Sequence, residues 1–215
     1  MTDTEKLTPE LLLSAYCSGV FPMAETAQGT SVFWVDPERR GVIPLHEFHV
    51  SKSLRKRLLS GKYEFSVNTC FEFVLDACAN RDETWINRSI RTQYNALHQM
   101  GFAHSVEVWR DEELVGGLYG VCIGGAFFGE SMFSRNTDGS KLALVALIAR
   151  LNAGGFALLD TQFLNNHLAT MGGIEISRDE FHEKLEKALG QDPDFWKLSA
   201  DTTPYTLWQL STQTS

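Results

Sequence analysis

The sequence predicts an α+β protein, of mixed α/β content, with a mixed central sheet. Three strand-like runs follow one another between residues 101 and 141, and Asp111-Glu112 and Gly124-Gly125 separate them as hairpin turns. Apolar residues at helical spacing dominate the chain before this meander. After it, helices and short apolar strands alternate. Helices, an antiparallel meander and then alternating elements are typical of the α+β class.

The composition is that of a globular protein. The chain has 215 residues, of which 43% are hydrophobic and 21% charged, which argues against disorder. No apolar run approaches the roughly 20 residues that cross a bilayer, and the acidic N-terminus does not look like a secretory signal. The four cysteines are scattered without a CxxC pair, so we expect a reducing cytoplasm and neither zinc nor disulfides.

The first 45 residues predict a small unit of their own. Thr8 followed by Pro9 is typical of a helix start, and Gly19 ends the helix expected over residues 9–18. A short strand is expected within residues 31–37. We therefore expect a small N-terminal α+β domain over residues 1–45, packed on a main domain over residues 46–215.

The main domain begins with three expected helices. They cover residues 52–60, 69–79 and 88–100, and a strand is expected within residues 63–68. The first of them carries the basic cluster Lys52, Arg55, Lys56 and Arg57. The net charge of −8 argues against a general nucleic-acid binder. From charge alone, this cluster indicates a solvated helix face.

The second half of the chain predicts the sheet and its cover. Strands are expected at 103–109, 114–121, 126–133, 156–160 and 175–177, and helices at 140–152, 163–170 and 178–189. The tail from residue 202 is polar, and we expect it to be partly loose.

Three residues at two strand ends carry candidate chemistry. Asp160 and Gln162 lie two residues apart at the end of an apolar strand, so both side chains should point to the same side. The alternative is that Asp160 caps a helix starting near residue 163. Glu130 lies between Gly129 and Ser131 at a strand end, where it either contacts a ligand or forms a salt bridge.

Several ordered motifs resemble one enzyme family, the leucyl/phenylalanyl-tRNA–protein transferases. The similarity covers roughly residues 8–185, and Met23 stands where some members have Trp. It rests on Gly19-Val-Phe21-Pro22, Thr84-Trp85-Ile86, Tyr94-x-x-Leu97-His98, Ala103-His-Ser-Val-Glu107, Leu114-Val-Gly-Gly-x-Tyr119-Gly120, Phe128-Gly-Glu-Ser-Met-Phe-Ser134, Ser140-Lys141 and Asp160-x-Gln162-x-x-Asn165-x-His167-Leu168.

This resemblance implies a reaction. Members move leucine or phenylalanine, with methionine as a further candidate, from aminoacyl-tRNA to the N-terminal amine of a protein that begins with Arg or Lys, which marks that protein for degradation. It implies an N-acetyltransferase-like (GNAT-like) core, which the order of elements also resembles, and a small N-terminal domain. We expect a monomer without metal or organic cofactor.

The resemblance also implies roles for individual residues. The catalytic centre is expected at Asp160 and Gln162, with Asp160 holding the incoming ammonium and orienting Gln162, and with Glu130 orienting the esterified amino acid. The remaining roles fall into three groups: an amino-acid pocket of Leu118, Phe127, Met132, Leu147 and Leu159; a surface for the 3′-terminal adenosine of Met23, Trp85 and Tyr94; and a phosphate track of Lys52, Arg55 and Lys56.

Two other functions stay open at this point. An acetyl-CoA-dependent N-acetyltransferase should carry a pyrophosphate-binding loop before the helix at 140–152, and Arg135–Ser140 matches such a loop weakly. A tRNA-binding module without turnover would make Asp160 and Gln162 dispensable.

Overall fold

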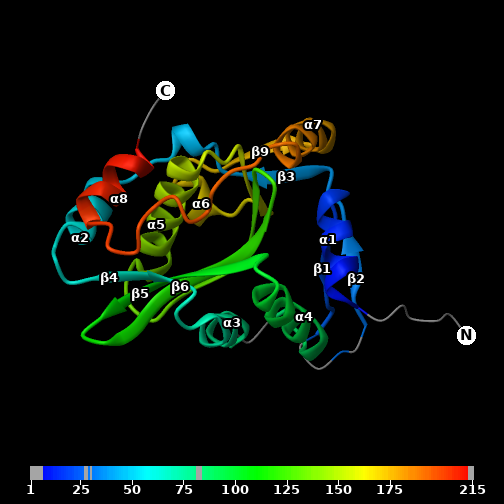
Figure 1. The fold of residues 1–215 in the computed structure, drawn as a ribbon, viewed down its shortest axis with the longest axis horizontal. Helices are drawn as coiled ribbons and strands as arrows, with labels where there is room; N and C mark the ends of the chain where they lie inside the picture. The colour runs from blue at the N-terminus through cyan, green and yellow to red at the C-terminus, as the bar shows by residue number, and fades with distance from the viewer. Residues whose placement is uncertain (1–6, 27–28, 30, 81–83, 213–215) are drawn as a thin grey trace, which may run out of the picture.

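The computed structural model describes residues 7–26, 29, 31–80 and 84–212, and Figure 1 shows their arrangement. The helices of this part are α1 Pro9–Cys17, α2 Lys52–Leu58, α3 Phe71–Ala79, α4 Arg88–Gln99, α5 Gly139–Gly154, α6 Asn166–Ala169, α7 Arg178–Leu189 and α8 Pro204–Ser211, with a 3-10 turn η1 at Leu45–Glu47. The strands are β1 Phe21–Met23, β2 Phe33–Val35, β3 Arg39–Val42, β4 Glu64–Val67, β5 Ala103–Arg110, β6 Glu113–Ile123, β7 Ala126–Ser134, β8 Leu158–Gln162 and β9 Ile174–Ser177.

The central sheet has seven strands in the order β4-β5-β6-β7-β8-β3-β9. The pairs from β4 to β7 are antiparallel, which confirms the predicted meander. At the first hairpin Asp111 and Glu112 have φ of 52° and 65°, as a type I′ turn requires. Helix α5 then crosses over, and β8 lies parallel to β7. The sheet is therefore mixed and mostly antiparallel, and the predicted α+β class is confirmed.

Helices cover both faces of this sheet (Figure 1). One hydrophobic cluster joins the sheet to α1, α3, α4 and α7, and a second joins it to α2, α5, α6 and α8. The middle of α5 is buried from Leu142 to Leu151, which explains why its sequence is apolar on every side. The sheet is thus the middle layer between two helical layers.

The N-terminal segment is joined to the rest of the molecule in two ways. Strand β3 lies in the large sheet between β8 and β9, although its sequence Arg-Arg-Gly-Val has no apolar alternation and was not expected to form a strand. Helix α1 places Leu12 and Tyr16 in the same cluster as Tyr94 of α4. The division into residues 1–45 and 46–215 stays a prediction.

The C-terminal tail is ordered as a helix over residues 204–211, so the expectation of a loose tail was wrong there. Thr203 caps α8 by accepting a hydrogen bond from Thr206 N at 3.2 Å, and Pro204 occupies the first turn. Leu207 is buried, and the Arg55 guanidinium of α2 lies 3.7 Å above the Trp208 ring. Residues 213–215 of the tail lie outside the described part of the chain.

Candidate active site

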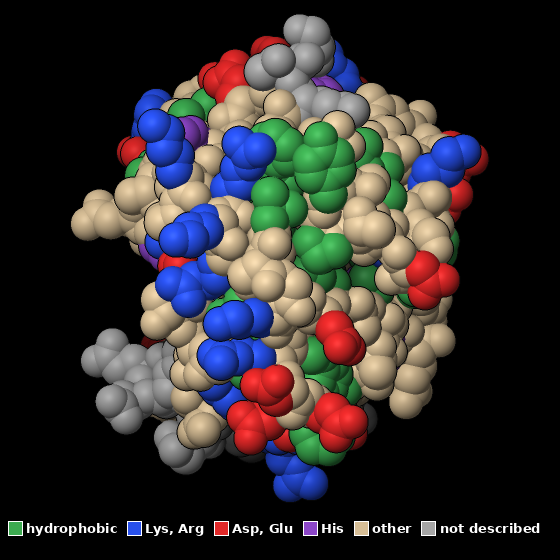
Figure 2. Space-filling view, turned by 90° about the vertical axis from the view of Figure 1, so that its left-hand side faces the viewer, with side chains coloured by type: hydrophobic (Ala, Val, Ile, Leu, Met, Phe, Trp, Pro, Cys, Tyr) green, Lys and Arg blue, Asp and Glu red, His purple; other side chains and the backbone are tan. Residues whose placement is uncertain are grey.

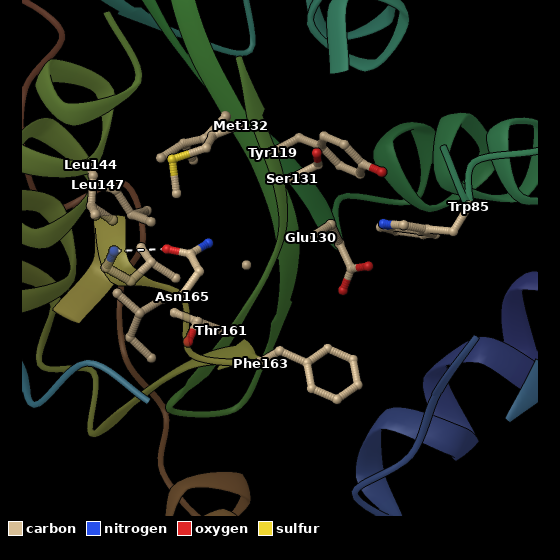
Figure 3. A pocket seen from close by; sticks show the side chains of 14 residues that line it. Trp85, Tyr119, Glu130, Ser131, Met132, Leu144, Leu147, Thr161, Phe163 and Asn165 are labelled. Carbon is tan, nitrogen blue, oxygen red and sulfur yellow. Dashed lines mark hydrogen bonds between the residues drawn. The ribbon is translucent and has the colours of Figure 1, made fainter. Parts of the chain in front are cut away.

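A cavity of about 160 Å³ opens beside the middle of the sheet, between β6, β7, β8 and α5 (Figure 3). A cavity of roughly this size holds a benzene ring in a well-studied engineered case. Figure 3 shows Met132, Leu144 and Leu147 on one side of it, and Glu130, Trp85 and Phe163 on the other. The cavity thus joins an apolar wall to a carboxylate.

A β-bulge aims Glu130 at this cavity. Tyr119 pairs with Ser131 and Gly120 pairs with Gly129, which leaves Glu130 as the extra residue of β7. Such a bulge bends the strand and redirects the side chain it carries. A Cβ at Gly120 would lie 2.3 Å from the Phe128 carbonyl oxygen, so the close approach of β6 and β7 here requires glycine.

Three side chains donate hydrogen bonds to the Glu130 carboxylate. Tyr16 Oη donates to Oε1 at 2.6 Å, Tyr94 Oη donates to Oε2 at 2.8 Å, and Gln162 Nε2 donates to Oε1 at 3.0 Å. The two tyrosine hydroxyls also contact each other closely. Burial raises the pKa of both tyrosines well above 10, and the nearby Glu130 charge raises it further, so both stay neutral donors.

Burial also dominates the titration of Glu130. It raises the pKa of this carboxyl from 4.5 to about 7; the hydrogen bonds from Tyr16, Tyr94 and Gln162 oppose the rise, and the charge of Asp160 adds to it. Glu130 therefore changes charge near neutral pH while it faces the cavity. A carboxylate in such a place binds an ammonium group with a pH dependence.

Asp160 does not face the cavity, which corrects the expectation that it binds the incoming ammonium directly. Its carboxylate is fully buried and accepts two hydrogen bonds from Arg40, from Nε at 2.8 Å and from Nη2 at 2.6 Å. The alternative role, a cap for a following helix, is also not observed, because Asn165 caps α6. The sequence reasoning missed Arg40, since an arginine in a charged stretch carries no local sign of burial.

Gln162 forms hydrogen bonds with both Asp160 and Glu130. Its backbone N–H donates to Asp160 Oδ1 at 2.8 Å, and its φ of 64° is unusual for a residue other than glycine. Thr161, between Asp160 and Gln162, lines the cavity instead of either. This hydrogen bond supports the prediction that Asp160 orients Gln162.

Four of the five residues expected in the amino-acid pocket line the cavity: Leu118, Met132, Leu147 and Leu159. Phe127 does not. It is fully buried and stacks near Phe195, with ring centroids 6.0 Å apart, so its place in the pocket lining was wrong. Leu144 and Leu168 complete the wall. The spacing of Leu144 and Leu147, one turn of a helix, was the signal that could have identified Leu144.

The residues expected to hold the terminal adenosine are not equivalent. Trp85 lines the cavity and is only partly buried. Tyr94 is fully buried and offers no ring face for stacking, so its role is corrected to that of a donor to Glu130. Met23 is partly buried against the first cluster. Phe163, which the sequence reasoning missed, is 48% exposed on the cavity wall.

The basic residues Lys52, Arg55 and Lys56 are exposed on α2 and do not line the cavity. Figure 2 shows Lys and Arg side chains gathered along one side of the face that carries α2 and α8. Arg57 points to Asp138, with 3.0 Å between Nε and Oδ2. The three predicted residues therefore belong to a charged surface apart from the cavity.

The described residues hold neither a metal-binding cluster nor a membrane-spanning helix. Across the described ranges, no group of three or more His, Cys, Asp or Glu side chains is arranged to hold a metal ion. Within the same part of the chain, every helix is too short or too polar to span a bilayer.

Similar proteins match nearly the full length of this chain. The family model described as leucyl/phenylalanyl-tRNA protein transferase matches residues 42–186, and that of its N-terminal domain matches residues 5–38. Curated relatives named leucyl/phenylalanyl-tRNA–protein transferase include proteins of Ruegeria sp. (strain TM1040), 56% identical over 97% of this chain and 99% of the relative, and Ruegeria pomeroyi, 54% identical over the same shares. The corresponding protein of Jannaschia sp. is 53% identical over 91% of this chain and 92% of its own.

Solved structures are more distant. The structure of L-PGS from Bacillus licheniformis is 14% identical over 82% of this chain and 62% of its own, with a TM-score of 0.41. This TM-score is too low to assign a fold. The two family models, in contrast, cover every residue that lines the cavity, together with Glu130 and its donors Tyr16, Tyr94 and Gln162. The chain belongs to the leucyl/phenylalanyl-tRNA–protein transferase family.

Proposed function

We propose that this protein transfers leucine or phenylalanine from aminoacyl-tRNA to the N-terminal α-amine of an acceptor protein. One observation carries the proposal: a cavity of about 160 Å³ with an apolar wall meets a buried carboxylate, Glu130. An esterified leucine or phenylalanine has an apolar side chain and a positively charged α-ammonium. The cavity offers a matching surface to each.

The finer parts of the proposal rest on the family resemblance. They are acceptors that begin with Arg or Lys, degradation of the product, methionine as a further donor residue, a monomer and a cytoplasmic location. A GNAT-like core is supported by the order of elements, in which an antiparallel meander, a helix and a parallel strand follow one another.

The reaction places modest demands on the protein. The acceptor amine attacks the ester carbonyl carbon; a C–N bond forms, the ester C–O bond breaks, and the departing ribose oxygen takes the proton. An α-amine has a pKa of about 7.7–8.0, so a useful fraction is neutral near pH 7. The ester is already activated, and holding both substrates in line supplies much of the acceleration.

Each residue of the network then has a role. Glu130, fixed by Tyr16 and Tyr94, holds the α-ammonium of the esterified amino acid. Gln162, held by its bond to Asp160, donates to Glu130 and aligns that carboxylate at the cavity wall. Gln is too weak a base to remove the proton unaided, so alignment is its contribution.

The tRNA is held by two surfaces in this proposal. Trp85 and Phe163 offer aromatic faces at the cavity for the terminal adenosine, where stacking contributes about 1–3 kcal/mol per base. The exposed cations of α2 bind phosphates of the acceptor stem. Phosphate contacts of this kind position the RNA without reading its sequence.

The structure of the α5 N-terminus disfavours an acetyl-CoA-dependent acetyltransferase. A pyrophosphate would need this helix end, but Gly139 packs there against Gly116, where a Cβ would lie 2.4 Å from the Gly139 carbonyl carbon. Asp138 adds a carboxylate beside it, paired with Arg57 at 3.0 Å and with Lys141 at 3.4 Å. A negative side chain at this position competes with a phosphate for the helix end.

One assay tests the proposed function. The protein is mixed with radiolabelled leucyl-tRNA and with peptides that begin with Arg, Lys, Asp or Ala, and label on each peptide is measured. We expect label on the Arg and Lys peptides. Parallel reactions with labelled acetyl-CoA should leave every peptide unlabelled. Acetylation without aminoacyl transfer would refute the proposal, and charged-tRNA binding without any transfer would favour a non-catalytic module.

A further inference from the structure

Arg40 is a buried arginine that nothing in the expected chemistry uses. It lies on β3, its side chain is 1% exposed, and it forms a two-pronged ion pair with Asp160, 120 positions further along the chain. The guanidinium is also stacked between Phe21, at 4.6 Å, and Phe181, at 4.3 Å, and Nη1 donates to the Gly19 carbonyl at 3.0 Å. Ring contacts on both faces and hydrogen bonds along its edge therefore fix the position of the guanidinium.

This pair connects to the cavity through a continuous set of hydrogen bonds. Arg40 Nε donates to Asp160 Oδ1, the same oxygen accepts the Gln162 backbone N–H at 2.8 Å, and Gln162 Nε2 donates to Glu130 at 3.0 Å. Asp160 has no oxygen that faces the cavity. Apart from the effect of its charge on Glu130, Asp160 reaches the reacting groups through the position of Gln162.

The backbone around Gln162 depends on β3 as well. Gly41 pairs with Gln162 and Val42 pairs with Asp160, so Thr161 is the extra residue of a bulge in β8. A Cβ at Gly41 would lie 2.6 Å from Leu164 N, which shows that the segment after Gln162 packs directly on this strand. The left-handed backbone of Gln162 is disfavoured for most residues and persists where its surroundings hold it.

We propose that Arg40 is a positioning residue for aminoacyl transfer, which acts by fixing Asp160 so that Asp160 holds Gln162 in its left-handed conformation against Glu130. The proposal rests on the proposed transferase function. Burying an ion pair is costly, and an apolar pair of similar volume often folds as well or better. Stability alone therefore does not explain this buried ion pair. We attribute it to the hydrogen bond between Asp160 and the backbone of Gln162.

The test separates the rate of transfer from tRNA binding. The single-turnover rate with leucyl-tRNA bound, and the dissociation constant for leucyl-tRNA, are measured for the wild type, Arg40→Met, Asp160→Asn and the double variant. We expect Arg40→Met to slow transfer by about 10²-fold, because misplacement by about 1 Å has this effect, and to leave the dissociation constant within about twofold. Arg40→Lys, which keeps the charge but not the two-pronged geometry, should recover part of the rate.

The double variant decides whether Arg40 acts through Asp160. If it does, Arg40→Met with Asp160→Asn is no slower than the slower single variant, because both changes break one unit. The proposal would be overturned if the fold-reductions in rate of the two single variants multiply in the double variant. A wild-type rate in Arg40→Met would overturn it too. A loss of tRNA affinity that accounts for the whole effect would overturn it as well.

Two further variants guard against misfolding and non-specific effects. Arg40→Met with Asp160→Leu removes both charges while it keeps apolar volume, so it should melt near the wild-type temperature and still transfer slowly. Wild-type transfer by this variant would refute the positioning role. Arg39→Met changes the neighbouring arginine, which is 60% exposed, and should transfer at the wild-type rate.

Wild-type protein that transfers nothing would refute the proposed function itself, whereas an active wild type with an active Arg40→Met would refute only this inference.

Discussion

Replacing Glu130 with Gln should stabilise the protein above neutral pH. Burial raises the pKa of this carboxyl from 4.5 to about 7, so its ionised form is disfavoured in the folded chain. Each pKa unit corresponds to about 1.4 kcal/mol, and the ionised carboxylate therefore lowers the free energy of unfolding by roughly 3 kcal/mol. A neutral Gln avoids this cost: its oxygen accepts from Tyr16 and Gln162, and its NH2 group donates to the hydroxyl oxygen of Tyr94, which rotates its proton away.

The sign follows from where the proton is bound. Between pH 4.5 and about 7 the folded protein keeps a proton on Glu130 that the unfolded chain releases. The contribution of Glu130 to stability is therefore fully present below pH 4.5 and is lost as pH rises through about 7. Glu130→Gln has no such loss, so the variant should gain on the wild type by up to roughly 3 kcal/mol across this window.

Urea unfolding of both proteins, followed by tryptophan fluorescence at several pH values from about 5 to about 8, measures this difference. Other titrating groups are common to both chains and cancel to first order. The variant should also fail to transfer leucine, since its amide cannot neutralise an ammonium. A difference in unfolding free energy that stays constant over the whole range would refute the reasoning about burial.

Three other predictions concern the substrate. Binding of leucyl-tRNA should weaken as pH falls through about 7, because protonated Glu130 does not hold an ammonium; uncharged tRNA is the control and should show no such fall. Reversing the charges of Lys52 and Lys56 should weaken tRNA binding and lower the slope of log affinity against log salt by roughly 1.5–2; an unchanged slope would remove both residues from the phosphate track. Leu147→Ala enlarges the cavity and should raise transfer of phenylalanine relative to leucine in a competition assay, and an unchanged ratio would place the side chain elsewhere.

Local patterns in the sequence were enough for most of the secondary structure. The meander was readable because Asp111-Glu112 and Gly124-Gly125 interrupt strand-like runs. Strand β3 was not readable, because two arginines and a glycine have no strand periodicity. Its stability comes from pairing with β8 and β9 and from the contact between Arg40 and Asp160, which are far away in the sequence. Helix α8 did carry a Thr-Pro start signal, which the polar character of the tail obscured.

The site divides in the same way. The sequence by itself determined the family resemblance, the apolar residues Leu118, Met132, Leu147 and Leu159, and the presence of two acidic side chains near strand ends. Only the tertiary structure decided that Glu130 faces the cavity and that Asp160 is buried against Arg40. The physical reason is that burial and ion pairing are set by segments distant in sequence: a β-bulge aims one carboxylate at the cavity, and a strand from the N-terminal segment covers the other.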